Sequence, residues 1–296
     1  MTWLPDGIAF VWYGSVLATV GAVGAARVFA SADNAYAPVW RQAALRVARL
    51  AAPLLLLALL ARLGMQTWLA FGGDRPMSLD LAVIILRDTY WGWGWTWQLL
   101  AGLACWVALA PSVTRGRRGW IVPLVAASGV GASVALTGHA AGVESGLASV
   151  TTAHAVHVIA AGLWLGTLAV VLRVTRQTNL TSAGARAAFA QAIDHFSPQA
   201  LVAVITLAAS GLVSAWEYVD SVAALLSPYG FVLIAKIIAF GSAGLCGVYN
   251  WRVVRPVLAA DPNGPDQLRS MAGLELAFGV AALILTSILT SMDAPH

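Results

Sequence analysis

Long apolar stretches alternate with short polar segments along the whole chain. The apolar stretches are each about 20 residues long or a little more and lie at 8–29, 44–70, 91–110, 120–138, 151–172, 197–216, 230–250 and 271–291. Such a length suits a helix that crosses a hydrocarbon layer of roughly 30 Å. The period-two alternation of a membrane β-barrel is absent. The pattern predicts an all-α, polytopic membrane protein with eight transmembrane helices.

The composition agrees with this pattern. Hydrophobic residues make up 59% of the chain and charged residues only 10%. The polar segments are too short to form a soluble domain, so we expect a single integral membrane domain over residues 1–296. Ser197 followed by Pro198 is typical of a helix start and predicts that the sixth span begins there.

The distribution of arginine predicts the orientation of the helices. If the N-terminus lies outside, thirteen arginines fall in inner loops or inner helix ends, and only Arg75 and Arg87 fall in outer loops. This is a strong positive-inside bias, so both termini should face away from the cytoplasm. The net charge of +4 follows from the same rule and gives no indication of nucleic-acid binding.

A short internal similarity relates the third and seventh spans. Thr89, Gly92, Trp95 and Gln98 share their spacing with Ser227, Gly230, Leu233 and Lys236. This predicts two tandem four-helix units, approximately 1–140 and 141–296, related by an axis along the membrane normal.

Three of the five histidines lie in "TGHAAGVESGLASVTTAHAVH", residues 137–157. His154 and His157 are three residues apart, so on a helix they project from one face. A loop of about twelve residues joins the fourth and fifth spans, which places His139 at the same outer depth. Imidazole binds copper, zinc, nickel and iron, so the stretch predicts a metal site. Other outward groups that suit such a site are Glu144, Met292 and His296.

Ionisable residues inside a membrane span are costly and therefore count as functional candidates. Arg62 is expected to face the bundle interior or a hydrated cavity, Lys236 lies in the outer half of the seventh span, and Glu275 is expected near the inner end of the eighth. Cys105 and Cys246 fall in the inner thirds of equivalent helices. They are either small buried hydrophobes or a pair that hands Cu(I) toward the cytoplasm.

Several motifs are absent. The chain has no GxxxxGK[ST] loop, since Lys236 is its single lysine, and no HExxH or GxSxG motif. ATP-driven transport by this chain alone and intramembrane hydrolysis therefore have no support. A binding or transport protein is favoured over an enzyme.

Four segments within about residues 128–291 carry a resemblance to known proteins. They are "LTGHAAG" from Leu136, "HVIAAGLWLGTLAVV" from His157, "FSPQALVAVITLAASGLVSAWEYV" from Phe196 and "SPYGFVLIAKIIAFGSAGLCGVYNWR" from Ser227. In this order they resemble the copper resistance protein D family of bacterial inner-membrane proteins. The N-terminal third matches only in its helix pattern and the "TYWGWGW" turn.

The resemblance implies copper handling at the cytoplasmic membrane, described as import, with a periplasmic copper-binding protein of the C type as partner. The family's motif positions correspond to His139, His157 and Lys236 in this sequence. His154 is a candidate ligand only because of its spacing from His157. The methionine-rich outer segments of some relatives are missing. Membrane lipid is the other expected partner, and a homo-oligomer is left open.

Two other functions remain open. Eight helices in two four-helix units also resemble haem A synthases, so the histidines are alternatively ligands of a b-type haem used for electron transfer or for reduction of a metal or quinone. His154 and His157 cannot be the two axial ligands of one haem, but His139 with either of them can. The second of these functions is a scaffold that binds a periplasmic copper protein.

Overall fold

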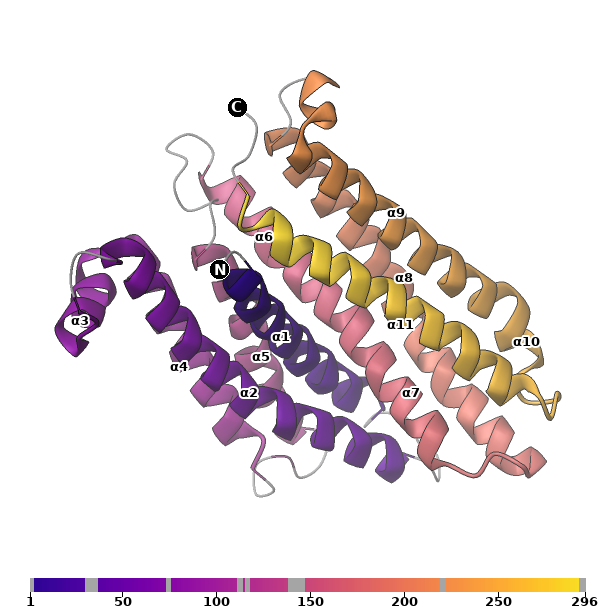
Figure 1. Cartoon of the computed structure of the whole chain (residues 1–296). Helices are drawn as coiled ribbons and strands as arrows, with labels where there is room; N and C mark the ends of the chain where they lie inside the picture. The colour runs from indigo at the N-terminus through magenta and orange to yellow at the C-terminus, as the bar shows by residue number, and fades with distance from the viewer. Residues whose placement is uncertain are drawn as a thin grey trace.

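The computed structural model describes residues 3–29, 37–72, 76–110, 114, 118–137, 147–218 and 222–292, and every regular element within them is helical (Figure 1). The first half contains α1 (Trp3–Phe29), α2 (Ala37–Phe71), α3 (Leu79–Asp88), α4 (Tyr90–Ala108) and α5 (Ile121–Ser133), which a 3₁₀ turn extends to Thr137. The second half contains α6 (Leu147–Ala161), α7 (Thr167–Gln177), α8 (Ala183–Tyr218), α9 (Pro228–Tyr249), α10 (Arg255–Val257) and α11 (Gly264–Leu289). Two π-helical segments, Gly162–Gly166 and Asn250–Val254, join α6 to α7 and α9 to α10.

The protein is a multi-pass helical membrane protein. Six helices within the described residues are long and apolar enough to cross a membrane: Leu4–Phe29, Ala37–Phe71, Thr151–Gln177, Ala183–Trp216, Pro228–Val257 and Gly264–Leu289. These six correspond to six of the eight predicted spans. The other two predicted spans coincide with α4 and with the shorter apolar helix Ile121–Thr137. Whether those two also cross the membrane stays a prediction.

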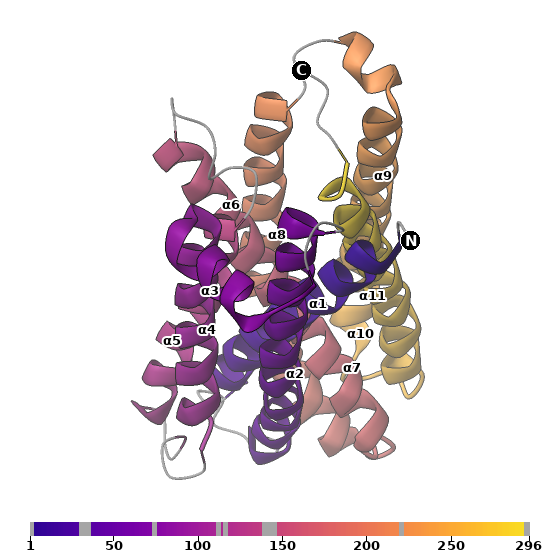
Figure 2. The same ribbon diagram turned by 60° about the vertical axis from the view of Figure 1, so that its left-hand side comes forward.

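Helix α1 lies at the centre of the bundle. It packs against α2 and α5 of its own half, and against α7, α11 and the Gly162–Gly166 segment of the other half. Around it, α4 pairs with α5, α6 with α8, and α9 with α11. Figures 1 and 2 show α4 and α9 on opposite sides of the molecule. The two halves therefore meet along α1.

The outer faces of the helices are strongly apolar. Large aliphatic side chains on α2, α8 and α9 are more than half exposed, among them Leu57, Leu60, Val202, Ile205, Ile237 and Ile238. A water-soluble protein rarely exposes so continuous an apolar surface. Contact with lipid acyl chains explains it.

The contact between α1 and the Gly162–Gly166 segment is a backbone-to-backbone crossing. A Cβ added to Gly21 would lie 2.2 Å from the carbonyl oxygen of Gly162, and one added to Gly166 would lie 2.3 Å from the carbonyl oxygen of Leu17. The Thr167 hydroxyl donates a hydrogen bond to the Gly21 carbonyl at 3.1 Å. Gly162 and Gly166 form a GxxxG motif, which allows such an approach between membrane helices. Glycine is required here because no side chain fits between the two backbones.

Helices α4 and α9 begin with the same local structure. The Thr89 hydroxyl accepts from the Gly92 N–H at 2.9 Å, and the Ser227 hydroxyl accepts from the Gly230 N–H at 3.1 Å. Both are N-caps, which satisfy an amide that has no partner within the helix. A Cβ on either glycine would collide with the backbone of the preceding helical segment. The predicted repeat requires that α4 and α9 begin alike, and their shared capping agrees with this. That the complete halves 1–140 and 141–296 are equivalent stays a prediction.

Two local expectations need correction. Helix α8 does not begin at Ser197 but runs from Ala183 through Pro198, and the Ser197 hydroxyl donates to the Ile193 carbonyl within the helix. Helix α11 begins at Gly264, so Glu275 lies near the middle of the helix instead of near its inner end. In both cases the helix extends into sequence that has too many polar residues to be recognised as part of a span. The short helix α3 was not expected, because its ten residues are too few to cross a membrane.

Candidate histidine site and buried polar groups

His154 and His157 lie on α6, and Ser210 of α8 faces the second of them. Nδ1 of His157 is 3.1 Å from the Ser210 hydroxyl oxygen. The Ser210 hydroxyl also lies within hydrogen-bond distance of the Thr206 and Leu207 carbonyls, at 2.7 and 3.2 Å. When its single proton is directed to one of these carbonyls, the Ser210 oxygen accepts from the Nδ1–H of a neutral His157. The lone pair is then on Nε2, the nitrogen free to bind a metal.

His154 has an unsatisfied ring nitrogen. Its Nε2 is buried and has no hydrogen-bond partner among the described residues. Leaving a buried polar atom unpaired costs about 1–3 kcal/mol, so such an atom requires an explanation. The chemistry of two imidazoles on one helix face fits a soft or borderline metal ion.

Lys236 of α9 approaches the same region. It is close enough to both imidazoles for its charge to act on them. The second half thus brings together His154, His157, Ser210 and Lys236 from three helices. A positive charge at this position repels other cations.

The remaining predicted ligands are not placed beside these histidines. His139, Glu144 and His296 lie outside the described residues. Met292 follows the end of α11, and its backbone N–H donates to the Leu289 carbonyl. Within the described parts of the chain, no group of three His, Cys, Asp or Glu residues is close enough to hold a metal ion. The three-histidine site therefore stays a prediction, of which His154 and His157 can be located.

Arg62 faces the interior of the first half, as expected. Its guanidinium lies 3.5 Å from the ring centre of Trp12, and Nη1 donates to the Thr137 hydroxyl at 3.2 Å. The Trp12 indole N–H in turn donates to the Gln98 side-chain oxygen at 3.0 Å. A cation–π contact of this kind stabilises a partly desolvated arginine by about 0.5–2 kcal/mol.

Trp12 and His157 occupy corresponding places in their helices. Each lies nine residues before the glycine, Gly21 or Gly166, that meets the other helix at the central crossing. Gln98, which contacts Trp12, is the predicted repeat partner of Lys236, which acts on His157. Under the predicted repeat, the first half has a tryptophan where the second half has a histidine.

Glu275 is held by two residues that sequence reasoning did not assign to it. Trp164 of the first π-helical segment donates its indole N–H to Oε1 at 2.8 Å, and Asn250 donates its side-chain N–H to Oε2 at 3.3 Å. The available signal for Asn250, and for Ser210, was a polar residue within an apolar helix.

The two cysteines are not brought together. Cys105 of α4 is fully buried in the core around α1, and Cys246 of α9 lies near Glu275. Both are free thiols on helices at opposite sides of the bundle (Figures 1 and 2). A direct thiolate pair that hands on Cu(I) is therefore not formed.

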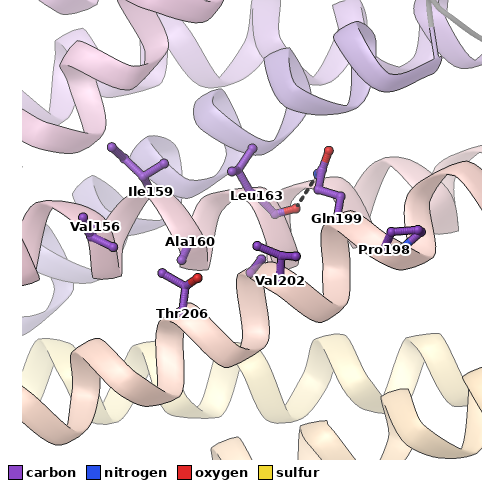
Figure 3. Close-up of a pocket in the computed structure, with 9 residues that line it drawn as sticks. Val156, Ile159, Ala160, Leu163, Pro198, Gln199, Val202 and Thr206 are labelled. Atoms are coloured by element: carbon purple, nitrogen blue, oxygen red, sulfur yellow. Dashed lines mark hydrogen bonds between the residues drawn. The ribbon is translucent and has the colours of Figure 1, made fainter.

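An apolar cavity of about 410 Å³ lies between α6 and α8 (Figure 3). Its wall contains Gln199, which donates to the Leu163 carbonyl at 3.3 Å, while most of the lining is aliphatic. It includes neither His154 nor His157, because its α6 residues occupy the neighbouring face of that helix. The cavity is a groove on the lipid side and not part of the histidine site.

Comparisons with known proteins give concordant matches. The family model "Copper resistance protein D-like, N-terminal domain" matches residues 1–150, and "Copper resistance protein D" matches residues 190–289. Copper transport protein CutJ of Bacillus subtilis is 27% identical over 250 residues, which is 81% of this chain and 44% of that protein. The chain thus spans less than half the length of this relative. No solved structure matches. The similarity reaches further into the N-terminal third than the sequence motifs indicated.

Proposed function

Because the chain belongs to the copper resistance protein D family, we propose that it transports copper across the cytoplasmic membrane, inward. Copper is captured at the periplasmic face by His154 and His157, with His139 as the third ligand. The eight-span arrangement with both termini outside is part of this proposal, since it places the histidines at the outer face. A periplasmic copper-binding protein of the C type is the proposed donor.

One observation carries the proposal. Ser210 holds Nδ1 of His157, which leaves Nε2 with its lone pair, and Nε2 of His154 is buried without a partner. Metal-binding histidines are oriented in this way, with the second ring nitrogen fixed by a hydrogen bond. A purely structural histidine pair would be expected to satisfy its buried nitrogens within the protein.

The first test measures copper bound by the purified full chain in detergent, with His154→Ala and His157→Ala. We expect each substitution to lower the copper affinity by at least tenfold, because each removes one ligand. His195→Ala is the matched control. His195 is exposed on α8 and its Nδ1 bonds to the Gln191 carbonyl, so its loss should leave copper binding unchanged. Unchanged binding in both site variants would overturn the histidine site.

The second test measures copper accumulation in proteoliposomes that contain the same variants. Uptake by the wild type and His195→Ala, with loss in His157→Ala, supports transport. Copper binding without uptake identifies the chain as a scaffold. A visible spectrum of the purified protein separates the haem alternative, since a Soret band that disappears in His157→Ala assigns the histidines to haem.

A further inference from the structure

Glu275 is a buried carboxylate without a positive partner. It lies on α11 eleven residues beyond Gly264, about 16 Å along the helix, and is only 6% exposed. The ion pairs Arg255–Asp194 and Arg269–Asp266 are exposed and do not include it. In the part of the chain that the structure describes, no lysine or arginine lies within ion-pair distance of its oxygens. An isolated charge at such a position is costly and marks a functional group.

The hydrogen-bond partners of Glu275 suit both of its protonation states. The Asn250 amide presents an N–H to Oε2, and its own Oδ1 is buried without a partner. If the carboxyl group gains a proton, a half-turn of this amide turns Oδ1 toward it as an acceptor. The Trp164 N–H donates to Oε1 in either state. The group can therefore change its charge without a rearrangement of the backbone.

The indole of Trp164 disfavours a metal ion at this carboxylate. The Trp164 indole can only donate an N–H to Oε1, whereas a metal ion requires lone pairs from its neighbours. The titratable group that faces Glu275 from α9 is Cys246, one helical turn before Asn250. A proton is the cation that this arrangement fits.

Trp164 connects Glu275 to the helix of the candidate copper site. It lies seven residues beyond His157 on a continuous helix, within the π-helical segment Gly162–Gly166. Asn250 begins the second π-helical segment. Such segments are frequent at functional sites, where they allow a local shift of a helix. Both hydrogen bonds to the Glu275 carboxylate thus come from π-helical segments, where a helix can shift locally.

We propose that Glu275 binds and releases one proton in each transport cycle and thereby couples copper movement to proton movement. The carboxylate takes a proton from water on one side of the membrane and returns it to water on the other, while no electron is transferred. This inference rests on the proposed transport function for the coupling, but the binding of a proton by Glu275 does not depend on copper.

The first experiment measures protonation directly. Infrared difference spectra of the full chain in lipid nanodiscs are recorded during a pH titration, for the wild type, Glu275→Gln and Asp266→Asn. Asp266 is on the same helix but 75% exposed, so its variant is the matched control. We expect a buried carboxylic acid C=O band in the wild type and Asp266→Asn that is lost in Glu275→Gln. The same titrating band in all three proteins would overturn the proposal.

The second experiment measures coupling in proteoliposomes that contain a pH-sensitive dye. Copper addition should move protons in the wild type and Asp266→Asn, with at least tenfold less movement in Glu275→Gln. Glu275→Asp should restore part of it, which separates lost proton binding from misfolding. Undiminished proton movement in Glu275→Gln refutes the coupling. Absence of copper uptake in the wild type refutes the proposed function instead, and the infrared result still decides whether Glu275 binds a proton.

Discussion

The substitution Gly21→Ala is expected to separate the two halves of the bundle. The new Cβ would lie 2.2 Å from the Gly162 carbonyl oxygen and 2.3 Å from Cα of Gly166, both backbone atoms that cannot turn aside. Relief to an ordinary contact of 3.4 Å requires the helices to move apart by about 1.2 Å. Such overpacking costs about 1–3 kcal/mol. The hydrogen bond from Thr167 to the Gly21 carbonyl adds about 0.6 kcal/mol when it is broken.

We therefore expect Gly21→Ala to lower the free energy of unfolding by about 2–4 kcal/mol. Unfolding in mixed micelles, followed by tryptophan fluorescence, measures this. Gly7→Ala on the same helix is the control, because nothing lies within 4 Å of its Cβ position. Gly166→Ala places a Cβ in the same crossing from the other helix. The double variant should therefore lower the free energy of unfolding by less than the sum of the two single variants. A Gly21→Ala protein as stable as Gly7→Ala, within about 0.5 kcal/mol, would refute the close-crossing argument.

Three further predictions concern the buried polar groups. Ser210→Ala should weaken copper binding by about 10–100-fold with both histidines present, because Nδ1 of His157 loses its acceptor; equal affinity in a copper competition titration would contradict the assignment of the ring nitrogens. Trp164→Phe keeps the aromatic ring but removes the N–H bound to Glu275, and should lower the free energy of unfolding by about 1–3 kcal/mol. An unchanged midpoint in the same unfolding assay would show that the hydrogen bond does not contribute. Arg62→Met should lose about 0.5–2 kcal/mol of cation–π stabilisation and change the tryptophan emission spectrum; identical stability and emission would argue against the stacked arrangement.

The histidine stretch shows how far local spacing reaches. An interval of three residues places His154 and His157 on one helix face whatever surrounds them, and their position in an apolar segment marks them as functional candidates. Neither fact indicates which nitrogen is free. Ser210, fifty-three residues further along the chain, determines that through a hydrogen bond across two helices.

The start of α11 shows where local spacing fails. The apolar run at 271–291 placed the beginning of the helix too late, because residues such as Asp266 and Arg269 interrupt the hydrophobic pattern. The helix nevertheless continues to Gly264, since the polar side chains of its first turns extend into water and pair with each other. Hydropathy measures where a helix is buried in lipid and not where its hydrogen bonds end.

The sequence by itself determined the class of this protein, the approximate places of its helices and the residues that are costly in a membrane, because these depend on local composition and on the length of a helix that crosses lipid. Even the glycines of the GxxxG motif are visible in the sequence. Only the tertiary structure decided that Gly21 meets them, that Cys105 and Cys246 stand apart, and that Trp164 and Asn250 hold Glu275. Each of these is a contact between helices far apart along the chain, and such contacts follow from how whole helix faces pack and not from any one segment.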